Sequence, residues 1–128
     1  MTEKELKLRA KSFALRIIKL VSSLPNDAAG RAIGSQLIRS GTSVAANYRA
    51  ACRGRSRAEF ISKLGTVEEE ADESCFWLEL IIEGELMSEK KVSPLLKEAN
   101  ELTAIFVSSK ISAKRNREIA DRRSKIGN

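Results

Sequence analysis

The sequence predicts an all-α protein, folded as an antiparallel up-down-up-down four-helix bundle. The 128-residue chain has only two prolines and seven glycines, and it is rich in Ala, Leu, Glu, Lys and Arg, which favour helix over strand. Apolar residues recur in four segments with alternating steps of three and four, the spacing of a bundle seam. Because the links between segments are short, consecutive helices must run antiparallel. The length fits one domain that buries its own core.

The first helix is expected over residues 3–23. Thr2 and Glu5 have the spacing of a capping box at its start. Pro25 stops the helix, and Asn26 with Asp27 turns the chain and caps the next segment. The seam residues are Leu6, Ala10, Phe13, Ile17, Leu20 and Leu24.

The second and third helices are expected over residues 29–52 and 57–86. Gly54 ends the second helix, and Ser56 with Glu59 forms another capping box. The second seam contains Ile33, Leu37, Ser40, Val44, Asn47 or Tyr48, and Ala51. The third has the cleanest heptad pattern in the chain, with Phe60, Leu64, Val67, Ala71, Ser74, Leu78 and Ile81.

The fourth helix is expected over residues 93–112, with Ser93 and Pro94 as its N-cap and first-turn residue. Its seam residues are Leu95, Ala99, Leu102, Phe106 and Ser109. Residues 113–128 lose the apolar period, so the bundle is expected to occupy 1–112 and a frayed or disordered basic tail to follow.

Apolar side chains exceed what one seam uses. The stretch CFWLELII at 75–82 is apolar in nearly every direction around a helix, and the first helix adds three apolar residues away from its seam. A helix that is apolar all round needs partners on more than one side. We therefore predict a homo-oligomer; the alternative is one wide seam with a few exposed apolar groups. The expected interface residues are Leu8, Leu15, Ile18, Phe76, Trp77 and Leu80.

The net charge of +6 is unevenly distributed along the chain. Residues 1–55 carry 11 Lys and Arg against 3 Asp and Glu, residues 56–106 carry 5 against 12, and residues 107–128 carry 7 against 2. Such segregation indicates either a nucleic-acid-facing surface or basic and acidic helices that lie side by side and neutralise each other.

Arginines and small residues are concentrated in the stretch RSGTSVAANYRAACRGRSRAEF at 39–60. A basic stripe beside Tyr48, a possible stacking ring, suits phosphate contact with RNA or DNA. The alternative is a helix C-terminus whose dipole favours cations. The candidate nucleic-acid-binding residues are Lys4, Lys7, Lys11, Arg39, Arg49, Arg53, Arg55, Arg57, Lys114, Arg115 and Arg117.

Asn47 and Ser43 are candidate structural polar residues on the second helix. A buried amide must find hydrogen-bond partners, and we expect polar groups of the third helix, such as Thr66, Glu70 or Ser74, or free backbone carbonyls. Asn47 would then fix the register of the bundle, and a ligand site is the alternative.

The residues argue against catalysis and metal binding. The chain has no histidine, which removes the most usual general base and the commonest metal ligand. Cys52 and Cys75 form no CxxC pair and are expected to be buried thiols, and the acids of EEEADE at 68–73 fan around a helix instead of converging. We expect no catalytic residue, metal or cofactor. No apolar run approaches the roughly 20 residues of a membrane span, so a cytoplasmic protein without a membrane partner is expected.

Three motifs carry a family resemblance: QLIRSGTSVAANY at 36–48, SRAEFISKLG at 56–65, and the acidic and aromatic run EEADESCFWLEL at 69–80. With KEANELTAIFVSS at 97–109, they make the chain resemble the bacterial four-helix-bundle proteins encoded in intervening sequences of 23S ribosomal RNA genes. The resemblance covers nearly the whole chain except the first residues and the tail. After Asn47, Tyr48 and Arg49 the family usually has glutamate, whereas Ala50 stands here.

The resemblance implies a ring-shaped pentamer of antiparallel bundles. One branch of this fold is similar to the accessory proteins of diversity-generating retroelements, which bind nucleic acid and a reverse transcriptase. We therefore expect a non-catalytic, pentameric RNA- or DNA-binding protein. The alternative is a protein adaptor that recruits a partner such as a reverse transcriptase. The fold itself supplies no reaction.

Overall fold

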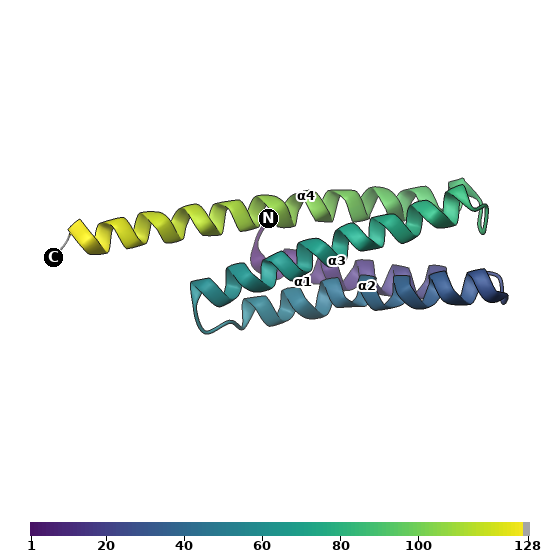
Figure 1. Cartoon of the computed structure of the whole chain (residues 1–128), viewed down its shortest axis with the longest axis horizontal. Coiled ribbons are helices and arrows are strands. Elements are labelled where there is room, and N and C mark those ends of the chain that lie inside the picture. Colours follow the sequence, from purple (N-terminus) through teal and green to yellow (C-terminus); the bar gives the residue numbers. More distant parts are fainter. Residues whose placement is uncertain (127–128) are drawn as a thin grey trace.

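The computed structural model describes residues 1–126 and contains four long helices. They are α1 (Glu3–Val21), α2 (Ala28–Cys52), α3 (Arg57–Glu83) and α4 (Glu89–Ile126). Each helix runs back along its predecessor, and α4 extends past the others at its C-terminal end (Figure 1). The predicted antiparallel four-helix bundle is confirmed.

Side-chain caps fix the starts of the first three helices at the residues that the sequence indicates. The Thr2 hydroxyl accepts a hydrogen bond from the Glu5 amide at 3.1 Å, and Ser56 accepts one from the Glu59 amide at 3.1 Å. Asp27 accepts from the Gly30 amide at 2.8 Å. These side chains satisfy amides that have no partner in a first helical turn.

The core is one continuous cluster along the bundle axis. Helix α2 packs between α1 and α3, α3 packs between α2 and α4, and a smaller contact between α1 and α4 closes the bundle. The largest fully buried side chains come from all four helices: Phe13, Ile17, Leu37, Val44, Leu64, Val67, Leu78, Ile81, Val92, Leu102 and Phe106.

Small residues on α2 let the helices approach closely at mid-length. A Cβ atom added at Gly41 would lie 2.8 Å from Ile17 Cγ1, so only glycine fits against α1 there. On the opposite flank, the Ser74 hydroxyl of α3 donates to the Ser40 hydroxyl of α2 at 2.9 Å, and both side chains are fully buried. This buried polar contact places Ser40 of α2 opposite Ser74 of α3.

Helix α4 begins at Glu89, four residues before the predicted start. Val92 is fully buried on the same face as Leu95 and Ala99, and its burial requires helix upstream of Ser93. The Ser93 hydroxyl donates to the Glu89 carbonyl at 2.7 Å, a bond within the helix in place of the predicted cap. The prediction that this helix starts at residue 93, with Ser93 as its N-cap, was therefore wrong.

The other end of α4 also differs from the prediction. The helix continues through Ile126, where the sequence predicted fraying or disorder from residue 113. Residues 113–126 contain no glycine or proline, and nine of their fourteen residues are Arg, Lys, Ala or Glu, so their intrinsic helix propensity carries the helix onward without a core-facing stripe. Residues 127 and 128 of the predicted tail lie outside the described residues.

Candidate nucleic-acid interface

The up-down-up-down path brings three sequence-distant segments to one end of the bundle. The start of α1, the turn between α2 and α3, and the second half of α4 meet there (Figure 1). We call this region the basic end. It contains nine of the predicted phosphate-contacting residues: Lys4, Lys7, Arg49, Arg53, Arg55, Arg57, Lys114, Arg115 and Arg117.

Two hollows mark the basic end and the adjoining face. One, of about 420 Å³, lies between the α2–α3 turn and α4, and Arg55, Arg57, Phe60 and Asn116 are among its lining residues. The other, of about 330 Å³, lies between α1 and α2. Its cationic lining residues are Lys7, Lys11 and Arg49, and the rest are Leu8, Thr42, Ala45 and Ala46.

The basic residues of these hollows carry unneutralised charge. Within residues 1–126 the ion pairs involve only Arg9, Arg39 and Lys110 among the cations. The side chains of Arg49, Arg53, Arg55 and Arg57 are exposed to solvent. An exposed, unpaired cluster of cations is the electrostatic footprint of a phosphate-binding surface.

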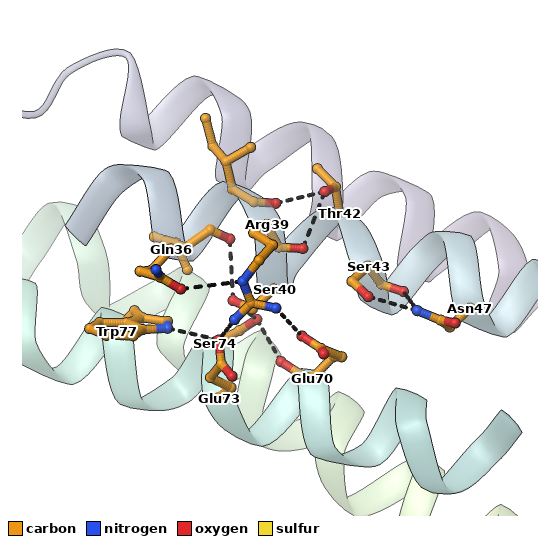
Figure 2. Close-up of polar contacts among 12 residues, drawn as sticks. Gln36, Arg39, Ser40, Thr42, Ser43, Asn47, Glu70, Glu73, Ser74 and Trp77 are labelled. Atoms are coloured by element: carbon orange, nitrogen blue, oxygen red, sulfur yellow. Dashed lines mark hydrogen bonds and ion pairs between the residues drawn. The ribbon is translucent and has the colours of Figure 1, made fainter. Parts of the chain in front are cut away.

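Arg39 does not belong to this cluster, contrary to the prediction. It lies at mid-length on α2 and pairs with Glu70 Oε2 at 3.1 Å and with Glu73 of α3. Figure 2 shows its guanidinium between these carboxylates, with Gln36 Oε1 accepting a hydrogen bond from Arg39 Nε at 3.2 Å. At mid-length, therefore, α2 and α3 lie side by side and neutralise each other's charge, which was one of the two interpretations of the charge pattern.

Asn47 pairs within its own helix instead of reaching α3. Its Nδ2 donates to the Ser43 hydroxyl at 2.6 Å and to the Ser43 carbonyl at 2.9 Å (Figure 2). The Ser43 carbonyl lies inside α2 and is not the free carbonyl that was expected, and the contact across helices is made by Ser40 and Ser74. Tyr48, and not Asn47, occupies the buried seam position of α2.

Tyr48 cannot act as a stacking ring for nucleic acid, because it is only 4% exposed. Its ring packs against Phe106 of α4, with the centroids 5.3 Å apart. Burial raises the pKa of its phenol above the ordinary value. The interpretation of this tyrosine as part of a binding surface was therefore wrong.

The predicted apolar surface divides into exposed and half-buried residues. Leu8, Leu15, Ile18 and Phe76 are 61%, 60%, 47% and 49% exposed. Trp77 and Leu80 are half-buried, since Trp77 packs against the core and its Nε1 donates to Glu73 Oε2 at 3.1 Å. The sequence reasoning missed Ile38, which adds to the exposed apolar surface of α2.

Arg9 was also missed, because its partners follow it by 89 and 92 residues. Its guanidinium binds Glu98 through two hydrogen bonds of 2.6 and 2.9 Å and Glu101 through one of 2.8 Å, which ties α1 to α4. Hydrogen bonding to Arg9 lowers the pKa of Glu98, and the same bond raises the pKa of Arg9. On α3, Glu68 lies 2.5 Å from Lys110 Nζ of α4.

The cysteines and the acidic run form no reactive arrangement in the part of the chain that the structure describes. Burial raises the pKa of Cys75, and burial together with a hydrogen bond to Glu3 raises that of Cys52 to about 11, so both thiols stay protonated at neutral pH. Within residues 1–126 no group of three acidic or cysteine side chains converges as a metal site. No helix in this range is long and apolar enough to cross a bilayer.

The fold and the site together define an all-α bundle with an unpaired basic end and exposed apolar residues on α1. The sequence profile of the family described as 23S rRNA-intervening sequence protein matches residues 3–108. The chain belongs to this family.

One solved structure, from Bacteroides thetaiotaomicron, shares 34% sequence identity with the chain and superposes with a TM-score of 0.80. The match covers 86% of this chain and 98% of that protein, which is described as a protein of unknown function from the S23 ribosomal protein family. No curated protein matches the chain.

Proposed function

We propose that this protein is a non-catalytic nucleic-acid-binding protein that contacts RNA or DNA phosphates through its basic end. The single observation that supports the proposal is the convergence of unpaired cations from α1, the α2–α3 turn and α4. Each cation that neutralises a phosphate releases a condensed counterion, and this release supplies most of non-specific affinity.

The experiment compares two variants with the same loss of charge. Arg53→Gln/Arg55→Gln/Arg57→Gln removes three cations of the basic end. Lys90→Gln/Lys91→Gln/Lys97→Gln removes three exposed cations near the start of α4, toward the opposite end. In fluorescence anisotropy with a structured RNA, the first variant should bind at least about tenfold more weakly, and the control should change much less. Equal losses, or no binding by the unmodified protein at low salt, would refute the proposal.

We further propose that the protein forms a homo-oligomeric ring, with five subunits as the resemblance implies. Leu8 and Leu15 share an exposed face of α1 with the cations Lys4, Lys11 and Lys19. Phe76 shares an exposed face of α3 with acids at spacings of three, four and seven: Glu69, Asp72, Glu79 and Glu83.

The basic face of α1 and the acidic face of α3 are complementary in charge, whereas two copies of either face are not. Packing the basic α1 face of one subunit on the acidic α3 face of the next buries apolar groups and pairs opposite charges. Packing a face on its own copy would oppose like charges. A contact between two different faces generates a ring when the rotation closes.

Light scattering tests the assembly. The unmodified protein should have the mass of five 14.1 kDa chains, and Leu8→Glu/Leu15→Glu should dissociate it. Ile119→Glu/Ile126→Glu is the matched control, because these exposed isoleucines lie on α4 beyond the proposed contact. A single 14.1 kDa particle at micromolar concentration would contradict the ring.

The second candidate function is that of a protein adaptor, for example one that recruits a reverse transcriptase. The exposed apolar residues of α1 favour it, because such residues mark protein contacts. The Arg53, Arg55 and Arg57 variant separates the two candidates. Loss of RNA with a retained protein partner supports nucleic-acid binding as the primary role, and the reverse outcome supports the adaptor.

A further inference from the structure

We propose that the basic end selects double-helical nucleic acid, held in a two-sided recess between the end face of the bundle and the projecting part of α4. The inference rests on the proposed function and adds the form of the ligand. The end face carries Arg53, Arg55 and Arg57, and we call residues 113–126 of α4 the arm. The arm lies beyond residue 108, where the family match ends.

The recess follows from the unequal lengths of the helices. Asn116 lines the hollow beside the α2–α3 turn, and α4 then continues to Ile126 past that turn (Figure 1). Ten residues at 1.5 Å each give a projection of about 15 Å, which spans roughly four phosphates along one strand. The end face and the arm can therefore contact one backbone from two directions.

Helical spacing distinguishes the two faces of the arm. Phe106 is fully buried, and Ala113, seven residues on, is half-buried beside the α2–α3 turn. Arg117 follows Ala113 by four residues and Arg123 follows Asn116 by seven, so both share this face. Arg115 and Arg122 point to the opposite side. Of the predicted arm residues, Arg117 thus faces the recess, and Lys114 and Arg115 do not.

The aromatic residues decide between single and double strands. Proteins that hold single strands stack successive bases on exposed aromatic rings, whereas double helices are bound through phosphates and shape. Within residues 1–126 only Phe76 is a well-exposed aromatic, and it lies on α3 beyond mid-length from the basic end. Tyr48 is buried, and the half-buried Phe60 packs against the core. The recess offers cations without a stacking platform, which suits a duplex.

The first measurement compares ligands on the unmodified protein at one salt concentration. A hairpin RNA duplex, a DNA duplex of the same sequence and an unpaired RNA strand of equal length are titrated by anisotropy. The RNA and DNA duplexes distinguish a general duplex site from an A-form-specific one. Either duplex should bind at least about tenfold more tightly than the single strand. Equal or tighter single-strand binding overturns the inference but leaves the proposed function intact, whereas no binding to any ligand refutes the proposed function itself.

The second measurement compares the two faces of the arm. Arg117→Gln/Arg123→Gln should weaken duplex binding about tenfold and lower the salt slope by about two. Arg115→Gln/Arg122→Gln, with the same charge loss on the outer face, should change the affinity less than about threefold. Equal losses of duplex affinity in the two variants would show that the arm acts only through its overall charge, and would contradict binding in the recess.

A Phe60→Leu variant completes the test, because Phe60 is the one ring that lines the hollow. Leucine preserves an apolar contact with the core but cannot stack on a base. Duplex affinity should stay within about twofold, since phosphate contacts are unchanged. A tenfold or larger loss, with the helical content preserved by circular dichroism, would show base stacking and contradict the inference.

Discussion

The middle of the α2–α3 contact and the basic end both contain arginines from the stretch 39–60, but their surroundings differ. At mid-length, Arg39 lies between two carboxylates of α3, and Ser40 bonds Ser74 in the core. At the basic end, the guanidinium groups of Arg53 and Arg55 have no carboxylate partner in the described chain, although the Arg55 backbone amide donates to Glu59. The middle holds the bundle together, and the end leaves charge available.

The register of two antiparallel helices explains the difference. Because Ser40 lies opposite Ser74, each step forward on α2 is a step back on α3. The acidic run at 68–73 therefore faces the middle of α2, and Arg53 lies level with the start of α3, where acids are few. Substitutions in the middle should change stability, and substitutions at the end should change binding.

The largest effect on stability is expected from Gly41→Leu. A Cβ atom there would lie 2.8 Å from Ile17, which is fully buried and cannot move aside. Overpacking at this site should lower the free energy of unfolding by about 2–3 kcal/mol, measured by urea denaturation. Gly65→Ala is the control, since no atom lies within 4 Å of its added Cβ. It should stabilise the protein by up to about 1 kcal/mol; a neutral Gly41→Leu would contradict the close approach of α1.

Glu98→Gln should cost about 1–2 kcal/mol by breaking two charge-assisted hydrogen bonds to Arg9. Since folding lowers the pKa of Glu98, its contribution is complete above the ordinary glutamate pKa of about 4.3. The contribution disappears as the pH falls through the lower folded-state pKa. Denaturation at several pH values should show this acid-dependent loss in the unmodified protein and a smaller one in Glu98→Gln. Glu101→Gln, which removes one exposed contact, should have less effect at every pH.

Ser74→Ala should destabilise the bundle by about 1 kcal/mol, because the buried Ser40 hydroxyl loses its partner on α3. The double variant Ser40→Ala/Ser74→Ala removes both hydroxyls and leaves no unpaired group. A double-mutant cycle should therefore show coupling of at least about 0.5 kcal/mol. Strict additivity would mean that the two serines do not interact across the helices.

The smallest effect on stability is expected at the basic end. Arg55→Gln/Arg57→Gln should change the free energy of unfolding by less than about 0.5 kcal/mol, because both side chains are exposed and unpaired. The same variant should bind RNA more weakly. A loss of stability comparable to that of Ser74→Ala would show that these arginines are structural, which would erase the difference between the two regions.

The architecture could be predicted from local signals. The caps at Thr2, Asp27 and Ser56 and the three-four apolar spacing depend on neighbours within one helix, so they appear directly in the sequence. The same signals failed at α4. Ser93 and Pro94 have the sequence features of a helix start, but they lie inside α4. Residues 113–126 lack an apolar stripe and are helical because of their intrinsic propensity.

The candidate site was less predictable, because it depends on contacts between helices. No local pattern reveals that Arg39 meets Glu70, that Arg9 meets Glu98, or that Tyr48 and not Asn47 fills the seam. Once the antiparallel order is known, however, the gathering of the other basic residues at one end follows from chain direction alone. The turn arginines remain candidate phosphate contacts, whereas Arg39 is paired with acids of α3.

The salt dependence of RNA binding by the unmodified protein tests the central claim most directly. If the basic end engages about six or more phosphates, the affinity should fall about a thousandfold or more between 50 and 200 mM salt. It should fall along a straight line in a plot of log affinity against log salt. A structured RNA that fails to bind at 50 mM salt, or that binds with an affinity independent of salt, would contradict the account.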